Sequence, residues 1–257
     1  MFAPANPQTA CGMWSLTYIF ALVAVLGMVA LGLVASRKMG EKTIFKTILI
    51  ITIVAWLSEF GKMLFVGVTY GVDRIEWVPL YFCSLFMYSG ILASITKVQW
   101  LKTTGLSFLS MGGIIGALAF FVYPSACIPN YPIYHYMCLR TMLYHGSMIY
   151  VGLLVLIKGY YKPKAKDFLN YFVALFVVGI LAYVINTLTG SDLMYISKPL
   201  AFKISQMAYN FCPQAYPFVL LILQIVVPFW VSFAIYQLMQ LIIKKTKKKE
   251  DNIYVYN

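Results

Sequence analysis

A cysteine and a histidine are the residues of this sequence whose chemistry is most distinctive. Cys83 lies in the segment Pro79–Leu85, near the beginning of an apolar stretch. If that stretch is helical, the thiol lies about one turn inside it, ~8 Å from its start at ~1.5 Å per residue. As a thiolate, Cys83 would be a nucleophile able to accept an acyl group. The alternative is a small apolar residue that packs between helices.

His145 is one of two histidines in the chain and lies in the segment Arg140–Gly146. We expect it ~8–10 Å below the start of its own apolar helix, a depth similar to that of Cys83. A histidine inside a membrane is uncommon and is a functional candidate by default. It would act as general base to a thiol, or it would form a hydrogen bond that ties two helices together. Cys138 and Thr141 share its helix face and are rival nucleophiles.

Other polar residues predict a substrate cleft beside this pair. Glu59 and Lys62 are three positions apart and can pair, either as the wall of a headgroup site or as a structural ion pair. Arg140 has the geometry to clamp a phosphate, although it could equally extend to water. Asn186 and Lys198 flank a polar stretch that predicts a binding loop, and the same residue types are also common in ordinary turns.

Templates for other kinds of chemistry are missing from the sequence. No glycine-rich phosphate loop precedes a predicted helix, and the histidines and cysteines lack metal-ligand spacing. We therefore predict no metal and no cofactor.

The elements that must position these residues follow from the composition. The 257 residues are 61% hydrophobic and 11% charged, with a mean hydropathy of +0.80. Soluble domains are roughly 45–50% apolar and about 25% charged, so the bilayer must be the solvent of this chain. Backbone groups in lipid must be paired within the segment, which predicts an all-α membrane helix bundle. The net charge of +12 does not predict a nucleic-acid partner, because the basic residues gather in short loops and a tail.

We predict a single membrane domain over residues 1–257 with seven transmembrane helices. The predicted spans are 14–36, 44–69, 78–95, 101–123, 138–157, 168–188 and 216–243. A basic tail follows at 244–257.

The basic residues predict the orientation of these spans. Fifteen of the 20 fall on one predicted side: Arg37, Lys38, Lys42, Lys46, Lys97, Lys102, Lys158, Lys162, Lys164, Lys166, Lys244, Lys245, Lys247, Lys248 and Lys249. The other side has Arg74, Arg140, Lys198 and Lys203, and Lys62 lies within a span. The positive-inside rule then places the N-terminus outside and the C-terminus in the cytoplasm of a multi-pass cell-membrane protein.

The predicted outer side carries two long loops, 124–137 and 189–215, of the kind that often form lids or binding loops. The working face is therefore predicted to be the outer one. Cys11, Cys127 and Cys212 also fall on this side, and a disulfide among them is possible in an oxidising compartment. The sequence does not say which pair would form.

Three stretches together resemble the YwaF-like family of bacterial integral membrane proteins. They are PLYFC at 79–83, RTMLYHG at 140–146 and NTLTGSDLMYISKP at 186–199, in that order along most of the chain. The resemblance implies a distant relation to a eukaryotic acyltransferase that moves fatty acyl chains between phospholipids without CoA, using a Cys and a His. Carried over, Cys83 would be the acyl-accepting nucleophile and His145 the general base. In this sequence Tyr81 and Phe82 precede Cys83 where relatives often carry a histidine.

Two functions follow as hypotheses. The first is a lipid acyltransferase or hydrolase with an acyl-Cys83 intermediate at the outer side and a membrane phospholipid as substrate. Glu59, Lys62, Arg140, Thr141, Asn186 and Lys198 would bind the substrate. The alternative is a membrane protein that binds a lipid or small molecule without chemistry, as a transporter or sensor. The sequence leaves the oligomeric state open.

Overall fold

The chain folds into helices joined by short turns and irregular segments. The structure is a computed structural model that describes residues 2–71, 78–125, 127–200 and 203–255, with side chains up to residue 246. Arg74, used above for the orientation, lies outside these residues. No strand occurs within the described ranges, which agrees with the all-α prediction.

The helices, in chain order, are α1 (Leu16–Ala35), η1 (Ser36–Lys38), α2 (Glu41–Tyr70), α3 (Leu85–Ile95), α4 (Gln99–Ser107), η3 (Phe108–Gly112), α5 (Gly113–Val122), α6 (Tyr136–Ile157), α7 (Asp167–Thr189), η4 (Leu193–Tyr195), α8 (Lys203–Phe211) and α9 (Tyr216–Val255). The segments α4, η3 and α5 form one continuous helix. Within the described residues, six helices are long and apolar enough to cross a membrane, and α3 is a shorter apolar helix.

The third predicted span is therefore shorter than expected. We predicted a helix over 78–95, but helix α3 begins only at Leu85. The preceding residues form turns, in which the amides of Leu85 and Phe86 donate to the carbonyls of Phe82 and Cys83. Cys83 thus lies in a turn before the helix and not about one turn inside it.

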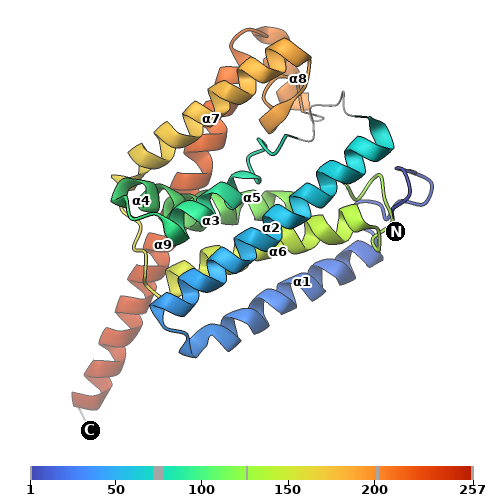
Figure 1. Cartoon of the computed structure of the whole chain (residues 1–257). Coiled ribbons are helices and arrows are strands. Elements are labelled where there is room, and N and C mark those ends of the chain that lie inside the picture. Colours follow the sequence, from blue (N-terminus) through green and yellow to red (C-terminus); the bar gives the residue numbers. More distant parts are fainter. Residues whose placement is uncertain (1, 72–77, 126, 201–202, 256–257) are drawn as a thin grey trace.

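The most buried helices lie at the centre of the bundle. Most residues of the α4–η3–α5 helix and of α6 are buried, whereas fewer than a third of the residues in the apolar stretches of α1, α2, α7 and α9 are buried. Helices α1 and α2 both pack against α6, and α7 packs against α9 (Figure 1). The central helix lies between these two groups, because α5 contacts α6 while α4 contacts α7. Exposed apolar side chains on the outer helices suit a lipid solvent.

Close helix packing in the centre depends on small residues. A Cβ on Gly105 would lie 2.6 Å from a backbone oxygen of α3, and one on Gly152 would lie 2.5 Å from a backbone oxygen of η3. The η3 segment is a π-helical turn, a feature that often marks functional sites. The hydroxyl of Ser232 in α9 donates to the carbonyl of Met111 in η3 at 2.8 Å. The central helix therefore combines close contacts with a locally widened backbone.

The N-terminal segment packs against the loop before α6. The amides of Asn6, Cys11 and Gly12 donate to carbonyls of residues 130, 131 and 128. All five cysteines are free thiols. The side chains of Cys127 and Cys138 form a hydrogen bond that lowers the pKa of Cys127. The thiol partner of Cys127 is thus Cys138, which the sequence indicated only as a rival nucleophile.

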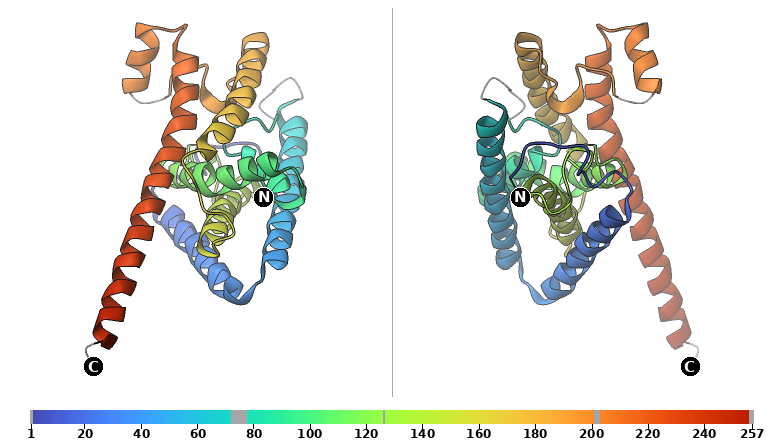
Figure 2. Two further views of the ribbon diagram at one scale, coloured as in Figure 1. Left: turned by 90° about the vertical axis from the view of Figure 1, so that its left-hand side faces the viewer. Right: turned by 90° about the vertical axis from the view of Figure 1, so that its right-hand side faces the viewer.

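Two predicted boundaries on the C-terminal side also change. The loop 189–215 is not irregular throughout, because it contains η4 and α8. Helix α9 does not end at residue 243 but continues to Val255, so most of the predicted tail is helical. Figure 2 shows α9 extending beyond the other helices towards the C-terminus.

Candidate functional site

Cys83 lies against the middle of helix α5. Its Sγ atom is 4.0 Å from the carbonyl oxygen of Gly116, and the residue is half-buried. A Cβ on Gly116 would come within 2.9 Å of the Phe82 ring, so only a glycine lets this turn approach the helix so closely. The Phe82 ring also packs against Phe108 of η3 at 5.3 Å between centroids. The thiol is therefore positioned by the packing of the turn on the central helix.

His145 lies in α6 with one ring nitrogen engaged. Its Nδ1 is 2.8 Å from the carbonyl oxygen of Thr141. Because a carbonyl only accepts, Nδ1 must carry the proton, which leaves Nε2 of the neutral ring as an acceptor. The ring stacks on Phe120 of α5, with centroids 3.9 Å apart and planes 14° apart. This tautomer is the one in which Nε2 can take up a proton.

Cys83 and His145 come from different segments, but both contact α5, on neighbouring turns of that helix. Their contacts on α5, Gly116 and Phe120, are four residues apart, ~6 Å along the axis. Tyr144 links the two, because its hydroxyl donates to the Cys83 carbonyl at 3.0 Å and its ring lies 5.6 Å from the His145 ring. Within the described part of the chain, no hydrogen bond joins the thiol directly to the imidazole.

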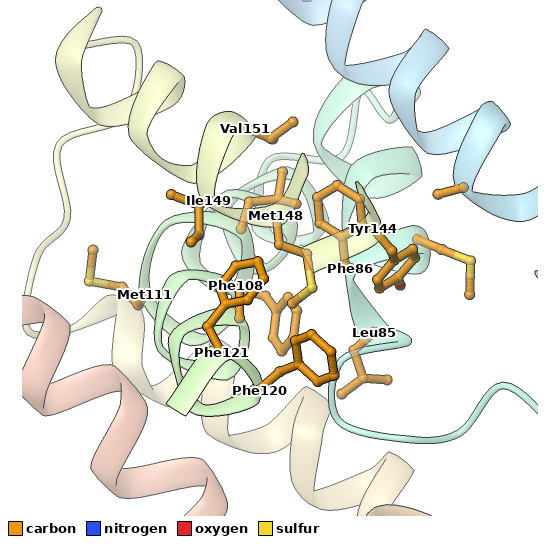
Figure 3. Packing of buried hydrophobic residues seen from close by; sticks show 14 of the residues in the cluster. Leu85, Phe86, Phe108, Met111, Phe120, Phe121, Tyr144, Met148, Ile149 and Val151 are labelled. Carbon is orange, nitrogen blue, oxygen red and sulfur yellow. The ribbon is translucent and has the colours of Figure 1, made fainter. Parts of the chain in front are cut away.

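The surroundings of this pair are apolar. Figure 3 shows Phe120 and Phe121 of α5 in one cluster with Tyr144, Phe86 and Phe108. The prediction that Cys83 and His145 lie at similar depths from the starts of their helices does not hold. Helix α6 begins at Tyr136, so His145 lies ~14 Å along it rather than 8–10 Å, while Cys83 precedes its helix.

A buried group of three charges lies on α2 and α6. Glu59 is 1% exposed, and its carboxylate forms ion pairs with both Lys62 and Arg140. The predicted Glu59–Lys62 pair is therefore present, and Arg140 is its unpredicted third member. Arg140 also donates from Nε to the Ser58 carbonyl at 3.3 Å. Lys62 Nζ lies 5.9 Å from the centroid of the Tyr81 ring, so the charges border the turn that carries Cys83.

The third sequence motif forms a folded loop at the end of α7. The Asn186 amide nitrogen donates to the Leu193 carbonyl and the Ser197 hydroxyl, and its oxygen accepts from Ser191 and from the Leu193 amide. These bonds use the hydrogen-bonding positions of the side chain, so Asn186 holds the loop together. Tyr195 of this loop lies 5.1 Å from Tyr81, ring to ring. The loop thus reaches the Cys83 turn through an aromatic contact.

Backbone strain accompanies that contact. Met194 and Tyr195 have φ angles of 57° and 54°, a region that non-glycine residues seldom adopt. The Met194 carbonyl is held by the Gln224 side chain of α9 at 2.9 Å. Strain of this kind often gathers at functional sites, and here it sets the position of Tyr195.

The two remaining predicted substrate-binding residues have local partners. The Lys198 ammonium is exposed and donates to the Gly190 carbonyl at 3.0 Å. The Thr141 hydroxyl donates to the Met137 carbonyl of its own helix at 2.7 Å. In the described residues no group of three or more His, Cys, Asp or Glu side chains is suited to a metal ion.

Sequence reasoning missed three aromatic residues and a glycine. Tyr81, Tyr144 and Tyr195 all lie inside the three motifs, but none of them was predicted as a site residue. Gly116 lies inside the predicted span 101–123, and nothing in the sequence indicates that the Phe82 ring packs against it. The signal available was a tyrosine within each motif, lying two residues before Cys83, directly before His145 and three residues before Lys198.

The fold and the site together define a multi-pass helical membrane protein with a thiol and an imidazole in its interior. The chain belongs to the TMEM164 family, whose sequence profile matches residues 7–236. Comparison with curated proteins and with solved structures finds no match. The resemblance to YwaF-like proteins and to a phospholipid acyltransferase stays a prediction.

Proposed function

We propose that this TMEM164-family protein is a lipid acyltransferase or lipid hydrolase of the cell membrane that works through an acyl-Cys83 intermediate on the outer side. The observation that carries the proposal is that the Cys83 thiol and the His145 ring, with its proton on Nδ1, contact successive turns of α5. A general base needs an unprotonated acceptor nitrogen, and the Nδ1 bond to Thr141 leaves Nε2 in that state.

The reaction would proceed in two balanced steps. His145 Nε2 takes the Cys83 proton, and the thiolate attacks the ester carbonyl of a phospholipid. The acyl C–O bond breaks, a thioester forms, and His145 gives the proton to the departing alkoxide oxygen, which leaves as the hydroxyl of the lysolipid. An acceptor hydroxyl or water then gives its proton to Nε2 and attacks the thioester. The C–S bond breaks, the new ester or fatty acid leaves, and Nε2 returns the proton to the Cys83 thiolate. General acid–base assistance of this kind contributes about 10²–10⁴-fold to a rate.

The phosphate of the substrate would bind beside the ion group. Glu59 carries one negative charge against the two positive charges of Lys62 and Arg140, so the group has a net charge of +1. Tyr81 and Tyr195 would flank the headgroup between the charges and the loop after α7. Asn186 and Lys198 would act by holding this loop.

Trapping the thioester tests the proposal. Purified protein in nanodiscs is mixed with a phospholipid, quenched in acid and weighed intact by mass spectrometry. We expect one acyl adduct that hydroxylamine removes and that is absent in Cys83→Ala. Cys212→Ala is the matched control, because it removes another half-buried thiol and should leave the adduct unchanged. His145→Gln should slow adduct formation about 10²-fold or more.

A binding protein without chemistry is the second candidate. It is favoured by one observation, namely that Cys83 and His145 form no direct hydrogen bond within the described residues. A folded protein that binds phospholipid, forms no adduct and keeps its binding in Cys83→Ala would overturn the enzyme proposal in favour of this one.

A further inference from the structure

A cleft lies at the lysine-rich end of the bundle. It has a volume of about 510 Å³ and lies between the first turns of α2, the end of α3 and the start of α4. Three lysines line it: Lys42 and Lys46 from α2 and Lys102 from α4. Phe45, Leu49 and Ser94 also line it.

The cleft carries an excess of positive charge. Glu41 is its one acidic lining residue, so the three lysines leave a net charge of +2. None of the three ammonium groups forms an ion pair with a side chain in the described part of the chain. Lys102 Nζ lies 4.4 Å from the centroid of Phe45, which fixes one ammonium group over the apolar floor. A cation held without a carboxylate partner is available to an anion.

Two further features point to an anionic ligand. The Ser94 hydroxyl oxygen is buried and has no hydrogen-bond partner within the described residues. Helix α2 begins at Glu41 after Gly40, which offers no side chain to cap the first amides. Unpaired first-turn amides and the helix dipole favour negative charge at this end.

The apolar side chains next to the lysines indicate an amphiphile rather than a free ion. Lys42, Lys46, Leu49 and Ile53 follow at helical spacing and so share one face of α2. Along this face the charges come first, Leu49 lines the cleft, and Ile53 is 48% exposed about one turn deeper. A phosphate at the lysines would therefore continue into acyl chains along the lipid-facing surface of α2.

We propose that this cleft binds the headgroup of an acidic phospholipid in the leaflet at the lysine-rich end. Lys42, Lys46 and Lys102 contact the phosphate, and Ser94 donates its hydroxyl to it. The site is separate from the Cys83 site, because Ser84, directly before α3, and Ser94, near the end of α3, are ten residues apart, ~15 Å. Basic pockets between membrane helices are suited to such headgroups.

Native mass spectrometry of the full chain measures the binding directly. The protein in detergent is titrated with dioleoylphosphatidylglycerol, with dioleoylphosphatidylcholine or with soluble glycerol 3-phosphate. We expect the acidic lipid to bind at least about tenfold more tightly than the zwitterionic lipid, since each lysine near an anionic headgroup contributes to attraction. We also expect glycerol 3-phosphate not to displace it.

Matched variants locate the site. Lys42→Gln/Lys46→Gln/Lys102→Gln should abolish the preference, while Lys162→Gln/Lys164→Gln/Lys166→Gln should keep it. The control removes the same charge from three exposed lysines at the same end of the bundle. Ser94→Leu fills the cleft without changing the charge and should also lose binding.

Three results would overturn the proposal. Equal loss in both triple variants would mean general attraction by net charge. Retained preference in Ser94→Leu would mean that the lipid binds outside the cleft. Displacement by glycerol 3-phosphate at concentrations similar to those of the lipid would mean a site for soluble phosphate.

Discussion

The buried ion group of α2 and α6 should contribute strongly to stability, and Glu59→Gln tests this. The substitution keeps the shape of the side chain but removes the charge that compensates both Lys62 and Arg140. The side chains of Glu59, Arg140 and Lys62 are 2%, 9% and 13% exposed. Two cations would then remain in an apolar interior without a counter-charge.

The size of the effect follows from that burial. Removing one partner of a buried ion pair costs about 3–5 kcal/mol. Lys62 is the more exposed cation and its long side chain can extend towards water, so the lower end of this range, about 3 kcal/mol, applies. At about 2–4 °C per kcal/mol for a chain of this size, Tm should fall by about 6–12 °C.

Thermal unfolding followed by intrinsic fluorescence in detergent measures the change. Glu41→Gln is the matched control, because it is the same substitution on an exposed residue of the same helix and should shift Tm by no more than about 2 °C. Glu59→Gln/Arg140→Gln should be less destabilised than the sum of its single variants, by about 1–3 kcal/mol. A Tm for Glu59→Gln within about 2 °C of the parent, or a coupling energy near zero, would refute the reasoning.

Two further predictions concern packing and pH. Gly105→Ala should cost about 1–3 kcal/mol of stability and lower Tm, because its Cβ would lie 2.6 Å from a backbone oxygen of α3. Gly27→Ala is the control and should not lower Tm, because nothing lies within 4 Å of its Cβ. Equal Tm values for the two variants would contradict the close packing at Gly105. Burial lowers the pKa of His135, whose Nδ1 caps α6 by accepting a hydrogen bond from the Met137 amide. Protonation of His135 is therefore disfavoured in the folded state. The free energy of unfolding should fall as pH drops below ~6.5 towards that lowered pKa. His135→Asn keeps a capping oxygen and should lose less Tm between pH 7.5 and 5.5, and an unchanged pH dependence would argue against His135 as the cause.

The long helices were predictable because hydropathy reports burial in lipid along the chain. Six predicted spans correspond to helices whose starts agree within about three residues. The third predicted span begins too early, because Pro79 and the apolar residues after it also fit the start of a helix. The turn at 78–84 instead packs against Gly116 of α5 through the Phe82 ring. Gly116 is more than thirty positions away in the sequence, so no local pattern encodes this contact.

The ion group of Glu59, Lys62 and Arg140 also contains a contact between distant parts of the chain that local sequence patterns do not predict. The Glu59–Lys62 pair follows from helical spacing alone, and the sequence predicted it. The Glu59–Arg140 pair depends on how α2 and α6 are rotated against each other, which spacing within one helix does not determine. For this reason Arg140 was identified as a candidate residue without its partner.

The irregular backbone around Cys83 gives a reason to place function there. Non-helical backbone at membrane depth is tolerated only where protein or a cavity covers it, because lipid offers no hydrogen bonds. Here the Cys83 carbonyl accepts from the Phe86 amide and from the Tyr144 hydroxyl, so the turn is satisfied by its own helix and by α6. Tyr144 precedes His145 in the chain, so a shift of α6 that moves the imidazole also acts on the carbonyl of the residue that carries the thiol. The positions of the two candidate reacting groups are thereby coupled through one hydroxyl group, even though the groups themselves are not hydrogen-bonded.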